Sequence, residues 1–84
     1  MDRKEVKKIL KSSCRGVLND LLEDVGFTAD EKRLFLERYI NDHSVVMCCI
    51  LIPCGHTKYH NLHNNILDKI KSYYLRTFWG LFDT

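Results

Sequence analysis

The strongest constraint on the fold is a helical pattern of apolar residues that begins directly after a turn. From residue 54 to residue 70 the chain reads CGHTKYHNLHNNILDKI. Its large apolar side chains recur at intervals of three and four, which places them on one helix face: Tyr59, Leu62, Ile66 and Ile70. We expect Tyr59, Leu62 and Ile66 to be buried against Phe35 and Tyr39. Pro53-Cys54-Gly55 precedes this pattern and predicts a tight break. The last helix therefore starts after Gly55, and its pattern can extend to Trp79, with Gly80 as terminator.

A short apolar segment, residues 44–52, stands before this break. Its β-branched residues fit a buried strand, whereas Ser44 can cap a helix and Pro53 can end one. No second alternating run is present to pair with such a strand, so a helix is the better prediction. A short helix, a turn and a longer helix have the layout of a helix-turn-helix, whose second helix enters a DNA major groove.

The remainder of the chain also predicts helices. Apolar residues between Asp2 and Val25 keep a period of 3.6, but Ser12-Ser13 and Gly16 weaken the middle, which leaves one bent helix or two short ones. Gly26 is a stop, and residues 28–31 (TADE) have the pattern of a capping box. We therefore expect an all-α fold, a small bundle of four or five helices that contains a helix-turn-helix.

Length and composition predict one folded domain. The 84 residues are 45% hydrophobic, near the size at which a single core is only just sufficient. We divide this domain into a helical segment at 1–26, the helix-turn-helix unit at 27–70 and an aromatic extension of the last helix at 71–84. Charged residues follow Met1, and the longest apolar run, 45–52, is too short to span a membrane. The sequence predicts a cytoplasmic protein with no membrane partner and with reduced, buried cysteines.

Charge is distributed unevenly along the chain. Residues 1–15 hold six cations and two anions, a local charge of +4, whereas residues 16–42 hold three cations and seven anions, a local charge of −4. Residues 43–67 have only one formal cation, Lys58, beside four histidines. A basic first helix can contact phosphates or can be an ordinary solvated face, and the sequence leaves both open.

Three consecutive stretches resemble a known family: FTADEKRLFLERYIN, HSVVMCCILIPCG and HTKYHNLHNNILDKI. Residues 27–70 look like the helix-turn-helix of sigma factor region 4, and more closely like its small phage relatives of the ArpU type. The residues that match the family pattern are Thr28, Asp30, Glu31, Arg38, Tyr39, Ile40, Ser44, Tyr59, Leu62, Asn64, Leu67, Lys69 and Ile70. In this chain Gly55 stands where the family usually has a serine cap, and Asn61 and His63 stand where Arg or Lys is common.

The resemblance implies a small transcription regulator of phage or mobile-element type that binds double-stranded DNA. The residues that the family pattern places toward the groove are His56, Thr57, Lys58, His60, Asn61 and Asn64. An asparagine among them could pair with an adenine edge, and the threonine could meet a thymine methyl group. Arg3, Lys4, Lys7 and Lys8 could add phosphate contacts from the first helix. A homodimer would double the contacts.

An alternative function follows from the short helix, which is apolar nearly all round and cannot bury every side chain in a three-helix unit. The chain could be a helix-turn-helix-derived module that binds and inhibits a host or CRISPR-type effector protein. The residues expected at that interface are Val46, Met47, Ile50, Leu51, Phe78 and Trp79. The aromatic residues of the C-terminal dozen could equally pack against the first helix.

Metal and catalytic sites are the weaker alternatives. Cys54, His56, His60 and His63 are zinc-type ligands, but they crowd into one turn and helix, whereas zinc sites usually draw on two separated pairs. His63 fits better as a hydrogen-bonded histidine at the edge of the core. No Gly-rich phosphate loop or nucleophile with an evident third partner is present in the sequence. We expect no cofactor, no metal and no enzymatic activity.

Overall fold

A computed structural model of the chain describes the backbone at residues 2–53 and 55–82, and side chains up to Thr77. The described residues form α-helices and one π-helical turn, without a strand. The elements are α1 (Arg3–Ser12), α2 (Arg15–Asp24), α3 (Ala29–Phe35), η1 (Leu36–Ile40), α4 (Val45–Leu51) and α5 (His56–Phe82). The predicted all-α bundle is confirmed, and so are the helix at residues 45–51 and the break before α5.

The segment 2–25 folds as two short helices because the chain turns at Ser13 and Cys14. Asp2 caps α1 by accepting a hydrogen bond from the Glu5 N–H, at 2.9 Å. At the other end, the Ser13 hydroxyl donates to the Ile9 carbonyl, at 2.6 Å, and occupies an acceptor that the helix leaves open. Cys14 then becomes the exposed N-cap residue of α2. The prediction that Cys14 is buried is wrong, because this break removes it from the apolar stripe.

The predicted capping box opens α3. The Thr28 hydroxyl accepts from the Glu31 N–H at 3.3 Å, and the Glu31 carboxylate accepts from the Thr28 N–H at 2.8 Å. Gly26 takes a φ of +84°, a left-handed conformation that favours glycine after a helix. Glu31 is buried and pairs with Lys69 of α5. Burial alone would raise the pKa of Glu31, but the hydrogen bonds from Lys69 and Thr28 lower it.

The π-helical turn η1 continues α3 without interruption. The Asn41 N–H donates to the Leu36 carbonyl, five residues earlier, at 2.8 Å. Asp42 then takes a φ of 57°, which ends the helix and sends the chain toward α4. The sequence predicts the end of this helix near Asn41 but not its wider turn. Such turns insert one residue and often occur at functional sites. Here Arg38 and Tyr39 both lie within the wider turn.

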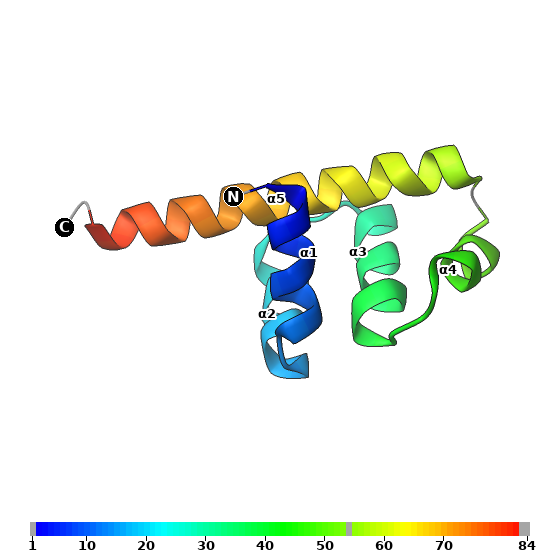
Figure 1. The fold of residues 1–84 in the computed structure, drawn as a ribbon, viewed down its shortest axis with the longest axis horizontal. Helices are drawn as coiled ribbons and strands as arrows, with labels where there is room; N and C mark the ends of the chain where they lie inside the picture. Colours follow the sequence, from blue (N-terminus) through cyan, green and yellow to red (C-terminus); the bar gives the residue numbers. More distant parts are fainter. Residues whose placement is uncertain (1, 54, 83–84) are drawn as a thin grey trace.

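Helix α5 forms one long edge of the molecule, and α1, α2 and α3 all lie on the same side of it (Figure 1). Its 27 residues extend about 40 Å, and α1 and α3 make its closest packing contacts. Apolar side chains from α1, α2, α3 and α5 close the core between them: Val6, Leu10, Leu18, Leu21, Leu34, Phe35, Tyr59, Ile66, Leu67 and Ile70. Segments 1–26 and 27–70 thus share one core.

Three expectations about α5 need correction or refinement. The helix continues through Gly80 to Phe82, so the predicted termination at Gly80 is wrong. Tyr59 and Ile66 are buried as predicted, but Leu62 is only half-buried and packs at the edge of the core. The neighbouring residue, His63, is buried instead. Tyr73 and Tyr74 pack partly buried against the core, which supports core packing for these two aromatic residues. None of the described helices is long and apolar enough to cross a membrane.

Candidate functional site

The first half of α5 exposes a polar stripe on the face opposite the core. Thr57 and Asn61 are exposed and Asn64 is half-buried, and their spacing of four and three places them on one line along the helix. His56, Lys58 and His60 are also exposed. Lys58 and His60 differ by two positions, about 200° around the axis, so they lie on opposite sides of this stripe. The six groove-facing residues predicted from sequence are therefore accessible, but only three form one line.

His63 lies between two tyrosine rings at the inner edge of this surface. Its Nε2 and the Tyr39 hydroxyl are hydrogen-bonded at 2.5 Å. The imidazole stacks on Tyr39 and on Tyr59, with ring centroids 5.8 Å and 5.5 Å apart. The prediction of a hydrogen-bonded histidine at the edge of the core is confirmed. The zinc alternative included Cys54, which lies outside the described residues; within those residues, no three metal-type ligands come together.

The protonation states at this stack follow from burial and from nearby charge. Burial, with further contributions from Lys7, Arg38 and His60, lowers the pKa of His63 to about 4. Burial raises the pKa of Tyr39 to about 12. Near pH 7 the imidazole and the phenol are therefore both neutral. The tautomer of the imidazole decides which of the two groups donates the hydrogen bond between them. The charges that act on His63 identify the cationic groups around it.

These cations line a pocket of about 150 Å³ between α1, η1, the start of α4 and α5. We call it the basic pocket; its lining residues are Lys7, Lys11, Arg38, Tyr39, Val45, Tyr59, His60 and His63. None of these eight side chains is acidic. The first half of α5 supplies only Lys58, but the fold brings two lysines of α1 and one arginine of η1 beside it. The cation deficit of residues 43–67 is thus a property of the segment and not of the surface.

The structure separates the first-helix cations that the sequence grouped together. Arg3 makes an ion pair with Asp68 of α5, at 2.9 Å, so its guanidinium already has an anionic partner. Lys4, Lys7 and Lys8 are all exposed, but of these three only Lys7 lines the basic pocket. Sequence reasoning missed Lys11 as a site residue and treated Arg38 only as part of the family pattern. The spacing of four between Lys7 and Lys11 could have indicated their common face; nothing in the sequence indicates where the π-turn places Arg38.

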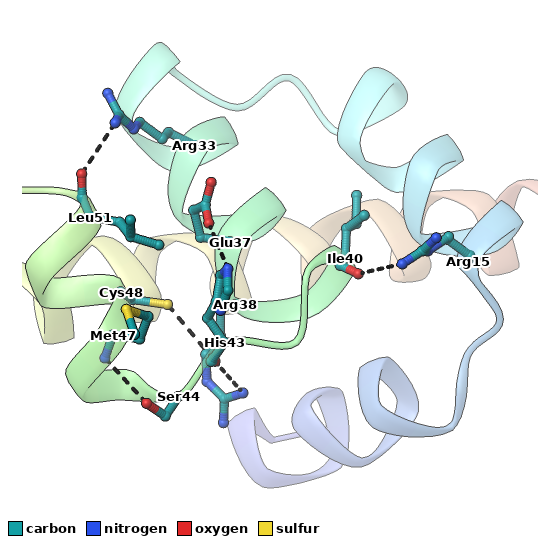
Figure 2. Close-up of polar contacts among 10 residues, drawn as sticks. All are labelled: Arg15, Arg33, Glu37, Arg38, Ile40, His43, Ser44, Met47, Cys48 and Leu51. Atoms are coloured by element: carbon teal, nitrogen blue, oxygen red, sulfur yellow. Dashed lines mark hydrogen bonds and ion pairs between the residues drawn. The ribbon is translucent and has the colours of Figure 1, made fainter.

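Arg38 is held by the segment that joins η1 to α4 (Figure 2). Its Nη1 donates to the His43 carbonyl at 3.3 Å, and its guanidinium lies 5.6 Å from the Tyr39 ring centroid. The His43 imidazole in turn lies 3.4 Å from the Glu37 carboxylate. These contacts fix the backbone before α4 and, together with a hydrogen bond to the Tyr59 hydroxyl, hold the guanidinium of Arg38 at the pocket.

Helix α4 presents an apolar surface instead. Ser44 caps it by accepting from the Met47 N–H at 3.2 Å, and Arg33 donates to the Leu51 carbonyl at 3.1 Å (Figure 2). Cys48 is fully buried and anchors the helix to the core. Four other apolar side chains of α4, which we call the α4 apolar face, are exposed: Val46 (63%), Met47 (40%), Ile50 (68%) and Leu51 (37%). These are the predicted interface residues on α4; the side chains of Phe78 and Trp79 lie outside the described residues.

Comparisons of the chain with protein-family models, with curated proteins and with solved structures found no match. The chemistry of the surface is therefore the basis for a function. Along α5 it combines amide and hydroxyl groups that can read hydrogen-bonding edges with cations that can neutralise an anionic backbone. On α4 it offers exposed apolar area without charge.

Proposed function

We propose that this chain is a small DNA-binding regulator of the helix-turn-helix class. Helices α4 and α5 would form the helix pair, and the first half of α5 would enter a major groove. One observation carries the proposal: the accessible polar stripe of Thr57, Asn61 and Asn64 lies on α5, and two lysines of α1 line a pocket beside the same helix. A polyanion with readable edges fits such a surface, whereas a neutral ligand would leave its cations without partners.

The edge position of α5 makes the docking geometrically simple. The other helices lie on one side of α5, so the opposite face can enter a groove about 12 Å wide (Figure 1). There Asn61 or Asn64 can make paired hydrogen bonds to an adenine edge, and Thr57 can contact a thymine methyl group. Phosphate contacts would come from the flanking cations, Lys58 on α5 and Lys7 and Lys11 on α1. The resemblance to sigma region 4 and ArpU-type regulators agrees with this docking.

Few phosphate contacts predict weak, salt-sensitive binding by one copy of the chain. Each neutralised phosphate contributes a slope of about 0.9 to log K against log salt concentration, so three or four cations give a total slope of about 3. A homodimer on a two-fold symmetric site would double that slope and recover affinity. Salt dependence and stoichiometry on one duplex therefore measure the number of copies that bind.

The test is a titration of labelled duplexes in low salt, followed by fluorescence anisotropy. We expect binding to any duplex, with a preference for some sequences. The Asn61→Ala variant should lose the preference at one base position and keep its affinity for unrelated DNA, because base contacts specify while phosphate contacts position. Ser72→Ala, an exposed change farther along α5, is the matched control. Absence of binding at protein concentrations above about 10⁻⁴ M would refute the proposal.

The α4 apolar face favours a second candidate, a module that binds a protein such as a host or CRISPR-type effector. Val46 and Ile50 are each more than 60% exposed, and their spacing of four residues places them on one outward face of α4. Contiguous exposed apolar area of this kind is typical of protein-binding surfaces. If no duplex binds, this second function is the one that the surface supports.

A further inference from the structure

We propose that the basic pocket binds a single phosphate group, held by Lys7, Lys11 and Arg38 with His60 at its rim. This inference rests on the proposed function in one respect: in the complex with DNA, the group would be one backbone phosphate beside α5. The pocket itself is complete without DNA, and it should therefore also bind inorganic phosphate. That property distinguishes a preformed anion site from a diffuse basic surface.

No cation of the pocket makes an ion pair with a described residue, although Arg38 donates a hydrogen bond to the His43 carbonyl. Arg3 pairs with Asp68 and Lys69 pairs with Glu31, but neither Lys7 nor Lys11 makes an ion pair with any described residue. Three like charges around one small space repel one another unless an anion joins them. The fold thus concentrates positive charge at one place where none of the lining side chains offsets it.

One carboxylate lies near the pocket without entering it. Asp42 lines an adjoining pocket together with Lys11 and Arg38, yet it forms no ion pair with either of them among the described residues. The φ of 57° at Asp42 ends η1 and belongs to the turn toward α4. Asp42 therefore weakens the local positive potential only in part, and the side of the pocket toward α5 remains free of acidic groups.

The donors and the size of the pocket select a phosphate group. Lysine and arginine are donors only, with three and five N–H groups, so their ligand must accept several hydrogen bonds. A tetrahedral oxyanion does so, and a guanidinium can contact two of its oxygens at once. A volume of about 150 Å³ holds a few water molecules, whereas pockets for whole small molecules measure roughly 300 Å³ or more. The basic pocket by itself thus has the size for one phosphate group.

His63 reports the occupancy of the pocket. The groups that face its imidazole are Lys7 from α1, Arg38 and Tyr39 from η1, and Tyr59 and His60 from α5. The charges of Lys7, Arg38 and His60 contribute to holding its pKa at about 4. A bound anion would offset those charges, so it should raise the pKa of His63 toward its ordinary value. A phosphate bound elsewhere on the surface would leave that pKa unchanged.

The experiment is a titration of the whole chain with inorganic phosphate at constant ionic strength, with sodium chloride as the reference. Imidazole resonances in NMR spectra give the affinity and the pKa of His63. We expect the His60 and His63 resonances to shift with phosphate and the pKa of His63 to rise. Lys11→Ala should weaken phosphate binding about fivefold or more, because it removes one charged donor. Lys8→Ala, on the same helix but outside the pocket, should bind phosphate as the wild type does.

A second arm uses duplex DNA and separates this inference from the proposed function. Lys11→Ala should lower the salt slope of duplex binding by about one unit, and Lys8→Ala should change it less. Duplex binding with no phosphate effect on His63, and with equal slopes for both variants, would overturn the pocket and leave the DNA function standing. Phosphate binding without duplex binding would support the pocket and overturn the DNA function. If Lys8→Ala weakens phosphate binding as much as Lys11→Ala, the pocket is likewise overturned.

Discussion

The basic pocket and the α4 apolar face are two exposed regions with opposite binding chemistries, and they are built differently. The pocket gathers side chains from α1, η1, α4 and α5, which lie far apart in the sequence. The apolar face belongs to one helix of seven residues. The difference shows that a cation count over one helix is a poor guide to whether that helix can bind a polyanion. Here neighbouring elements supply the charge that α5 lacks.

Charge reversal at the pocket should have the largest effect. In Lys7→Glu/Lys11→Glu, duplex affinity in low salt should fall about 100-fold or more, because two phosphate contacts become repulsive. Lys4→Glu/Lys8→Glu changes the net charge by the same amount on the same helix but outside the pocket, and its loss should be at least tenfold smaller. Fluorescence anisotropy measures both. Equal losses of duplex affinity would show that only the net charge of α1 matters and that the basic pocket makes no specific contact with DNA.

The next effect in size concerns His63 and stability. Its folded-state pKa of about 4 lies below the ordinary value of 6.5, so the unfolded chain takes up the proton more readily. Stability from this residue is therefore complete above about pH 6.5 and is lost as the pH falls toward 4. Between pH 7.5 and 4.5 the free energy of unfolding should decrease by about 2 kcal/mol.

Urea denaturation followed by circular dichroism at several pH values measures this decrease. The His63→Gln variant keeps a hydrogen-bonding group for Tyr39 but cannot take up a proton, and should lose most of the slope in this window. Glu31 contributes at lower pH, since its pKa is lowered from 4.5 and its stabilisation is lost only below that value. If His63→Gln keeps the wild-type slope, the imidazole is not held neutral by its surroundings.

The smallest effect is expected at the α4 apolar face. Ile50 is 68% exposed, so Ile50→Asp should change the free energy of unfolding by less than about 0.5 kcal/mol. The same variant should bind duplex DNA as the wild type does, since the polar stripe and the pocket remain intact. Cys48→Asp, in contrast, places a charge in the anchored side of α4 and should unfold the helix pair. A large loss of DNA binding in Ile50→Asp would place α4 at the DNA and merge the two regions into one surface.

Local rules account for most of the secondary structure that the sequence predicts. The capping box at Thr28, the Ser44 cap and the stop at Gly26 depend on residues within a few positions of one another, and all three occur as predicted. The wrong predictions concern positions at which tertiary packing determines which side chain is buried. Leu62 and His63 are neighbours on α5, and the helical pattern alone favours the leucine for the core. Tyr39 of η1 and Tyr59, one turn earlier on α5, instead enclose the histidine.

The candidate site also has one part that the sequence predicts and one part that depends on tertiary packing. The exposed polar stripe of α5 follows from the spacing of Thr57, Asn61 and Asn64 and could be predicted in full. The pocket could not, because the approach of α1 to η1 depends on how both pack against α5. Lys7 and Lys11 share a face of α1, but no local pattern says which helix that face meets.

The sequence by itself determined the all-helical fold, the positions of the caps and the break before α5, since each follows from backbone geometry and short-range hydrogen bonds. The tertiary structure alone decided which charges are paired and which converge. Arg3 and Lys7 are one turn apart on α1, yet the first pairs with Asp68 and the second lines the basic pocket. The physical reason is that electrostatic interactions depend on distances between side chains of different elements, and those distances are set by core packing.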